Sequence, residues 1–95
     1  HAAGYNYGFK MNALAARPAA ERDFVLGNAQ RLHAVGYSGE DMTELAARPA
    51  AERDFVLANG QQLHAAGYNY GFKMNALAAR PDQRNAFLRQ IGQRD

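Results

Sequence analysis

Apolar residues recur three and four positions apart along most of the chain, which is the spacing of amphipathic helices. In residues 37–67, one apolar side is formed by Met42, Leu45 and Ala46. A second apolar face follows at four-residue spacing through Phe55, Asn59 and Leu63 and is widened by Val56 and Leu57. The pattern therefore predicts a short helix followed by a longer one.

Punctuating residues mark where these two helices begin and end. Ser38 is a preferred N-cap, and Asp41 three residues later completes a capping box. Pro49 cannot donate a backbone hydrogen bond, so it ends the short helix and suits the first turn of the longer one. Gly67 stands where a left-handed C-cap is expected. The predicted unit is a short helix, a Pro corner, a longer helix and a Gly corner.

The unit occurs more than once. The string LAARPAAERDFVL stands at residues 14–26 and again at 45–57, HAAGYNYGFKMNALAARP stands at 1–18 and 64–81, and a divergent copy opens with LAARP at Leu77. A period of 31–32 residues is typical of solenoids. We predict an all-α fold, a right-handed α-solenoid of two-helix (αα-hairpin) repeats. The expected helices lie near 7–16, 19–34, 39–47, 50–65, 70–79 and 82–91.

The repeats divide a single domain, residues 1–95, into a partial N-terminal unit (1–13), two repeats (14–44 and 45–76) and a C-terminal capping unit (77–95). The residues expected in the core are Phe24, Leu32, Phe55, Leu63 and Phe87 on the long helices and Leu14, Leu45 and Leu77 on the short ones. Asn69 is the expected cap of the helix near 70–79, and Tyr70, Phe72 and Met74 are expected to cover a solenoid end.

Composition narrows the class of protein. The 95 residues are 47% hydrophobic and 21% charged, which is typical of a folded domain. With no cysteine, the chain has no disulfide and no thiolate site. No apolar run reaches the roughly 18 residues of a membrane span and no signal peptide opens the chain, so we expect no membrane partner and favour an intracellular location. The start at HAAGY without Met suggests a trimmed or engineered sequence, and the near-identical copies fit a designed or a recently duplicated array equally well.

Residues that could support catalysis are scarce. Ser38 and Thr43 are the only aliphatic hydroxyls, and neither a GxGxxG nor a P-loop pattern is present. We therefore expect no enzyme activity and no cofactor. His33 and His64 hold matched positions, with His1 as a third, but stacked repeats lie about 10 Å apart. We interpret these histidines as helix-terminal cations and expect no metal site.

Asn28 and Asn59 lie in the middle of the predicted long helices, each beside a glycine. One interpretation is a row of amides lining a groove, and the favoured one is a hydrogen bond between repeats at a tight helix crossing. Gly27 and Gly60 suggest close backbone approach, because glycine in a helix costs about 1 kcal/mol relative to alanine.

Arginines recur at every Pro corner and would align along one edge of a stack. They are Arg17, Arg48 and Arg80 before the prolines and Arg22, Arg53 and Arg84 after them. Such a ladder could contact phosphates. Acidic residues are interleaved with it, and the net charge of +2 forms a patchwork with basic ends. Most of these arginines are therefore expected to pair locally, and with Asn28 and Asn59 they remain the candidate partner-binding residues.

The run YSGEDMTELAARPAAERDFVLANGQQLHAAG resembles the repeats of transcription-activator-like effectors, which also join a Ser/Thr-capped short helix to a longer helix closing on Gly. The positions that match are Ser38, Glu40, Met42, Leu45, Ala46 and Gly67. The Gly-Tyr-Ser turn and Pro49 are similar to mitochondrial transcription-termination-factor repeats. Both families follow nucleic acid with stacked units, so the resemblance implies DNA binding. The interhelical loop, which varies between effector repeats, is the same in both copies here, so no base-reading code is expected.

These observations predict a non-enzymatic helical-repeat scaffold or binding module. Its partner would be a protein, a peptide or another copy of itself, and nucleic-acid binding is the alternative. The fold alone does not choose between them.

Overall fold

The computed structural model describes residues 15–93. Within this range all regular structure is helical, so the predicted all-α class is confirmed. The helices are α2 (Ala19–Ala34), α3 (Gly39–Ala46), α4 (Ala50–Ala65), α5 (Gly71–Ala78) and α6 (Pro81–Gln93). Most of the helix expected at 7–16, and Leu14 with it, lies outside the described residues. None of the described helices is long and apolar enough to cross a membrane.

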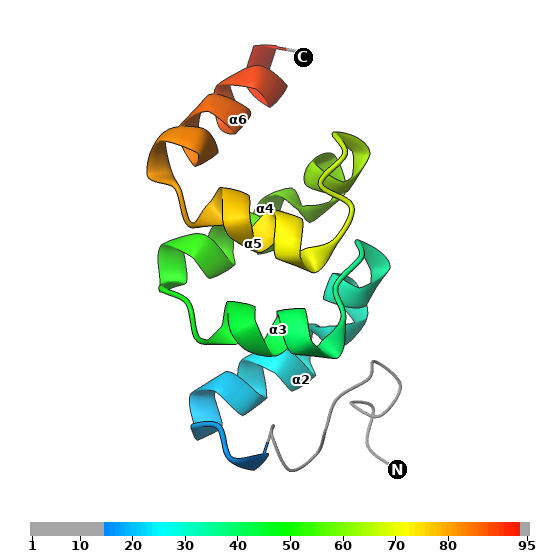
Figure 1. Ribbon diagram of the computed structural model, residues 1–95, viewed down its shortest axis with the longest axis vertical. Coiled ribbons are helices and arrows are strands. Elements are labelled where there is room, and N and C mark those ends of the chain that lie inside the picture. The colour runs from blue at the N-terminus through cyan, green and yellow to red at the C-terminus, as the bar shows by residue number, and fades with distance from the viewer. Residues whose placement is uncertain (1–14, 94–95) are drawn as a thin grey trace.

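The segments that match in sequence adopt helices of matching length. The helices α2 and α4 each have 16 residues, and α3 and α5 each have 8. Each long helix packs on the short helix that follows it, α2 on α3 and α4 on α5, and α3 and α5 lie side by side in a body of 43 × 22 × 17 Å (Figure 1). The helices with the most extensive contact are thus those joined by a Gly corner. The sequence pattern had instead predicted a unit whose two helices are joined by the Pro corner.

Backbone conformation at the corners explains this pairing. Gly36 and Gly67 have φ of 107° and 106°, the left-handed region that glycine tolerates best. After each glycine the tyrosine N–H reaches back to a leucine carbonyl of the long helix, from Tyr37 to Leu32 and from Tyr68 to Leu63. These bonds close the end of the long helix and turn the chain sharply. The next short helix therefore packs back against the preceding long helix.

The first residues of the short helices are capped differently. Ser38 accepts a hydrogen bond from the Asp41 N–H at 3.2 Å, as predicted. The prediction of Asn69 as a cap was wrong, because Tyr70 holds the N-cap position of α5 and provides no side-chain cap. The start of α5 therefore depends on packing rather than on a capping side chain.

The core contains most of the residues that the spacing predicted. Leu32, Phe55, Leu63, Phe87, Leu45 and Leu77 are all buried. Phe24 is only partly buried, because the buried stripe of α2 runs through Val25, Ala29 and Leu32 and leaves Phe24 at its edge. The Arg53 guanidinium covers the Phe24 ring at 5.6 Å from its centroid. At the other end, Phe87 of α6 packs edge-on against Phe55 and Tyr68, each with ring centroids 6.1 Å apart.

Candidate functional site

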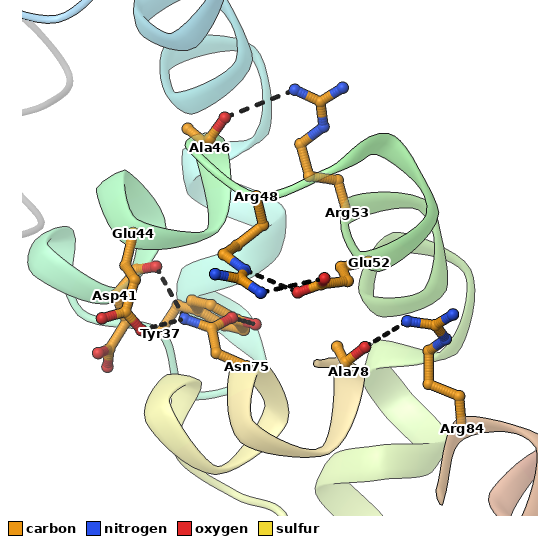
Figure 2. A network of polar contacts seen from close by, with 10 residues as sticks. All are labelled: Tyr37, Asp41, Glu44, Ala46, Arg48, Glu52, Arg53, Asn75, Ala78 and Arg84. Carbon is orange, nitrogen blue, oxygen red and sulfur yellow. Dashed lines mark hydrogen bonds and ion pairs between the residues drawn. The ribbon is translucent and has the colours of Figure 1, made fainter. Parts of the chain in front are cut away.

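The most elaborate polar cluster lies where α5 docks on α3, and we call it the short-helix junction, formed by Tyr37, Asp41, Glu44 and Asn75 (Figure 2). The Gly36 turn directs Tyr37 beneath α3, where its side chain is 1% exposed. The Tyr37 hydroxyl donates to Asn75 Oδ1 at 2.7 Å, which joins two residues 38 positions apart in sequence. The junction therefore ties together segments that belong to different copies of the sequence unit.

Asn75 satisfies both ends of its amide in this junction. Its Nδ2 donates to the Asp41 carbonyl at 3.3 Å and to Glu44 Oε1 at 3.1 Å, while its Oδ1 accepts from Tyr37. Among the described residues, every buried side-chain nitrogen or oxygen has a hydrogen-bond partner. Burial, reinforced by the charges of Asp41 and Glu44, raises the pKa of Tyr37 well above its usual range. The phenol is thus held protonated, as a donor, throughout the neutral range.

The backbones of the two copies also meet at this point. The Gly71 N–H donates to the Gly36 carbonyl at 3.2 Å. A Cβ added at Gly71 would lie 2.6 Å from the Asp41 Cβ and 2.7 Å from the Tyr37 ring, closer than real Cβ contacts. An alanine at position 71 would therefore push α5 away from α3.

Two of the arginines that precede a proline form ion pairs one helical turn along the chain. Arg17 binds Glu21, with Nε 2.8 Å from Oε1. Arg48 binds both carboxylate oxygens of Glu52, at 2.8 and 3.2 Å (Figure 2). Arg80 has Arg84 instead of a glutamate four residues later, and its side chain has no ion pair within the described range. Of the three arginines that precede a proline, Arg80 thus differs from the other two in this part of the chain.

The arginines that follow the prolines point back toward helix ends. Arg53 Nη1 donates to the Ala46 carbonyl at 3.5 Å, and Arg84 Nη1 donates to the matching carbonyl of Ala78 (Figure 2). Arg22 Nη1 donates to the Arg17 carbonyl at 2.6 Å. Carbonyls at a helix C-terminus carry partial negative charge and lack intrahelical donors. Arg53 and Arg84 therefore act as C-terminal caps of α3 and α5, whereas the Arg17 carbonyl that Arg22 binds lies just before the start of α2.

The favoured interpretation of Asn28 and Asn59, a hydrogen bond between repeats, does not appear among the described residues. Asn28 Nδ2 donates to the Phe24 carbonyl at 2.8 Å, and Asn59 Nδ2 donates to the Phe55 carbonyl at 2.9 Å. Each bond stays within its own helix, because a short amide on a helix surface readily reaches the carbonyl four residues earlier. Within residues 15–93 these amides do not join repeats, and their lining of a groove stays a prediction.

The two mid-helix glycines also differ from expectation. A Cβ on Gly27 would meet nothing within 4 Å, so no close approach occurs there. A Cβ on Gly60 would make ordinary contact with the Val35 side chain, at 3.4 Å. Neither helix crossing requires a glycine.

Histidine and acidic residues do not gather into a ligand set in the described part of the chain. No group of three such residues there could hold a metal ion. His64 lies in the last turn of α4, and its Nδ1 is 3.1 Å from the Val35 carbonyl. His1 lies outside the described residues. The geometry of His64 fits a helix-terminal contact between the two long-helix ends.

Two open grooves and one aromatic pair lie on the surface around α5. The lining of the first, which we call the Tyr68 groove, includes Gly67, Tyr68, Lys73, Ala76, Arg80 and Gln83. The second, which we call the Phe72 groove, is lined by Glu44, Arg48, Phe72, Asn75, Ala76 and Ala79. Tyr70 and Phe72 stack with their centroids 5.7 Å apart and are 53% and 57% exposed. They leave their rings open to solvent, contrary to the expectation that they cover an end, whereas Met74 is fully buried.

Comparison with protein-family models, with curated proteins and with solved structures finds no match to this chain. Sequence reasoning missed the short-helix junction. Its signal was the recurring Gly-Tyr pair at 4–5, 36–37 and 67–68, together with an asparagine among apolar residues of a short helix.

Proposed function

We propose that the chain is a solenoid of helical repeats that serves as a non-enzymatic scaffold and binds a protein or peptide. Each long helix packs on the next short helix, and α3 and α5 stack directly, which is the arrangement that a two-helix repeat requires. Five of the six corner arginines bond within the fold: Arg17 and Arg48 form ion pairs, Arg53 and Arg84 cap helices, and Arg22 binds the Arg17 carbonyl.

The observation that carries the proposal is the exposed aromatic pair, Tyr70 and Phe72. Aromatic residues left open on a folded surface are typical of protein interfaces, where they bury large area at low entropic cost. Lys73 Nζ lies 5.4 Å from the Tyr70 ring centroid and adds a positive charge beside the pair. The surface therefore suits a peptide that presents an apolar side chain next to a carboxylate.

The chain supplies its own control for this surface. The matched helix α3 has Ser38 and Glu40 where α5 has Tyr70 and Phe72, so Tyr70→Ser/Phe72→Glu transplants residues that this fold already carries. We would select peptides from a random display library against the wild-type chain and measure their affinity by fluorescence anisotropy. Loss of the pair should weaken binding by at least about tenfold, the effect of about 1.4 kcal/mol.

Leu26→Glu is the matched surface control, because Leu26 is 47% exposed on α2, a different helix. It should leave peptide affinity unchanged. Failure to select any peptide, or equal loss of affinity in both variants, would contradict the assignment of this surface.

Nucleic-acid binding is the second candidate because of one specific observation: Arg80, which has no ion pair with a described residue, lies beside Lys73 in a groove with no carboxylate in its lining. The test is a titration with random duplex DNA at two salt concentrations. Binding through phosphates would make log affinity fall with log salt by about 0.9 per contact. Arg80→Ala should then reduce that slope by about one unit, while the internally bonded Arg48 and Arg53 should matter less. No binding at low salt would remove this candidate.

A further inference from the structure

The Tyr68 groove on α5 matches, in sequence position, the surface around α3 on which α5 docks. Matched by sequence, Gly67, Tyr68, Lys73, Ala76 and Arg80 correspond to Gly36, Tyr37, Asp41, Glu44 and Arg48. On α3, these positions hold the incoming helix: the Gly36 carbonyl and the Tyr37 hydroxyl bond Gly71 and Asn75. On α5, the same positions line an open groove.

The side chains that the groove should accept are known from α5. Gly71 permits close approach over the tyrosine, and Asn75 four residues later pairs with the phenol. Lys73 lines the Tyr68 groove, on the side of α5 away from this contact. A helix that docks in the same way therefore needs glycine and asparagine four residues apart. A lysine between them, at the position of Lys73, would face away from the contact.

The chain carries a second segment with these residues. Residues 1–18 are identical to residues 64–81, so GFKMN at 8–12 repeats the GFKMN of 71–75 that docks on α3. We infer that the Tyr68 groove binds residues 8–12 of a second copy, with Gly8 over Tyr68 and Asn12 beside the Tyr68 hydroxyl, so that copies join head to tail. This inference rests on the proposed repeat architecture. The groove does not include Tyr70 or Phe72, although Lys73 lies beside both surfaces.

A head-to-tail contact is heterologous and need not close, so association should continue beyond dimers. Sedimentation velocity at rising concentration should show growing oligomers of the wild-type chain. Gly8→Val should stop residues 8–12 from docking, because the valine side chain would collide with the groove as a Cβ on Gly71 would collide with Asp41 and Tyr37. Ala76→Arg should block the groove, since Ala76 is exposed and a long cation there would face Lys73 and Arg80. Each variant alone should remain monomeric.

Mixing the two variants is the decisive step. The Gly8→Val chain keeps a working groove and the Ala76→Arg chain keeps a working head, so an equimolar mixture should form dimers and stop there. A self-complementary interface would not give this result. The inference is overturned if the wild type stays monomeric at its highest soluble concentration, if either variant still forms oligomers, or if the mixture stays monomeric.

Two further variants test the atoms of the contact. Tyr68→Phe removes the hydroxyl that Asn12 would meet, and should weaken association by about tenfold. Ala76→Glu introduces the carboxylate that Glu44 offers to Asn75 on α3, and should tighten association by about tenfold. Unchanged association in both variants, with their helical circular dichroism intact, would also overturn the inference. Because peptide binding at Tyr70 and Phe72 is measured separately, failure of one proposal is distinguishable from failure of the other.

Discussion

Removing one oxygen atom from Tyr37 should cost the fold far more than removing the same atom from Tyr68. The Tyr37 hydroxyl is buried and is the donor to Asn75 Oδ1 at 2.7 Å. Tyr37→Phe leaves that buried oxygen without its donor, which costs about 1–3 kcal/mol. Tyr68 is partly exposed, and its hydroxyl has no hydrogen bond within residues 15–93, so Tyr68→Phe should change the free energy of unfolding by less than about 0.5 kcal/mol.

The assay is equilibrium urea unfolding followed by circular dichroism in dilute solution, where copies are apart. Adding Asn75→Ala and the double variant closes a double-mutant cycle, which isolates the coupling between the two side chains. We expect a coupling energy of about 1–2 kcal/mol between Tyr37 and Asn75. Equal effects of the two Tyr→Phe changes, or a cycle with no coupling, would refute the view that this bond holds α5 to α3.

The other predictions concern stability and can be measured by urea unfolding. Gly27→Ala should stabilise the chain by about 1 kcal/mol, because position 27 is exposed in mid-helix with nothing near its Cβ; any loss of stability would contradict the open site. Gly36→Ala and Gly67→Ala should both destabilise the chain, since each glycine has positive φ, but Gly36→Ala should cost more because its Cβ would also collide with the Asn69 carbonyl. Phe55→Ala should cost about 3–5 kcal/mol and the half-buried Phe24→Ala clearly less, and equal losses would show that the core is misassigned. Because the pKa of Tyr37 is raised in the folded chain, the unfolded chain loses that proton first, so the free energy of unfolding should fall as pH rises above about 10. Tyr37→Phe should remove about 1.4 kcal/mol per pH unit from that slope, and an unchanged slope would place the phenol in solvent.

The sequence predicts the helices well because their limits are set locally. Ala19–Ala34 and Ala50–Ala65 begin and end where the Pro and Gly corners predicted, since proline and positive-φ glycine act within one or two residues. Ser38 caps α3 for the same local reason. The start of α5 is less local: Asn69 was expected as its cap, but the N-cap position is held by Tyr70, which makes no side-chain cap hydrogen bond.

The candidate site is harder to predict because it depends on contacts between distant segments. Tyr37 and Asn75 are 38 residues apart, and periodicity along one helix says nothing about which polar side chain meets which. Asn28 and Asn59 were misinterpreted for the opposite reason, since their partners lie in the same helix. The corner arginines differ according to the residue four positions later. Glu21 and Glu52 pair with Arg17 and Arg48, whereas Arg84 stands at that position after Arg80, which has no ion pair among residues 15–93.

Proton NMR of the Tyr37 hydroxyl can show whether one copy of the sequence unit docks on the next through the short-helix junction. A phenol that is 1% exposed and hydrogen-bonded should exchange slowly with water and show cross-peaks to the Asn75 side-chain amide. We expect both signals in the wild-type chain, and we expect them to disappear in Gly71→Ala, which pushes α5 away. Fast hydroxyl exchange in the wild-type chain, with no cross-peak between Tyr37 and α5, would contradict it.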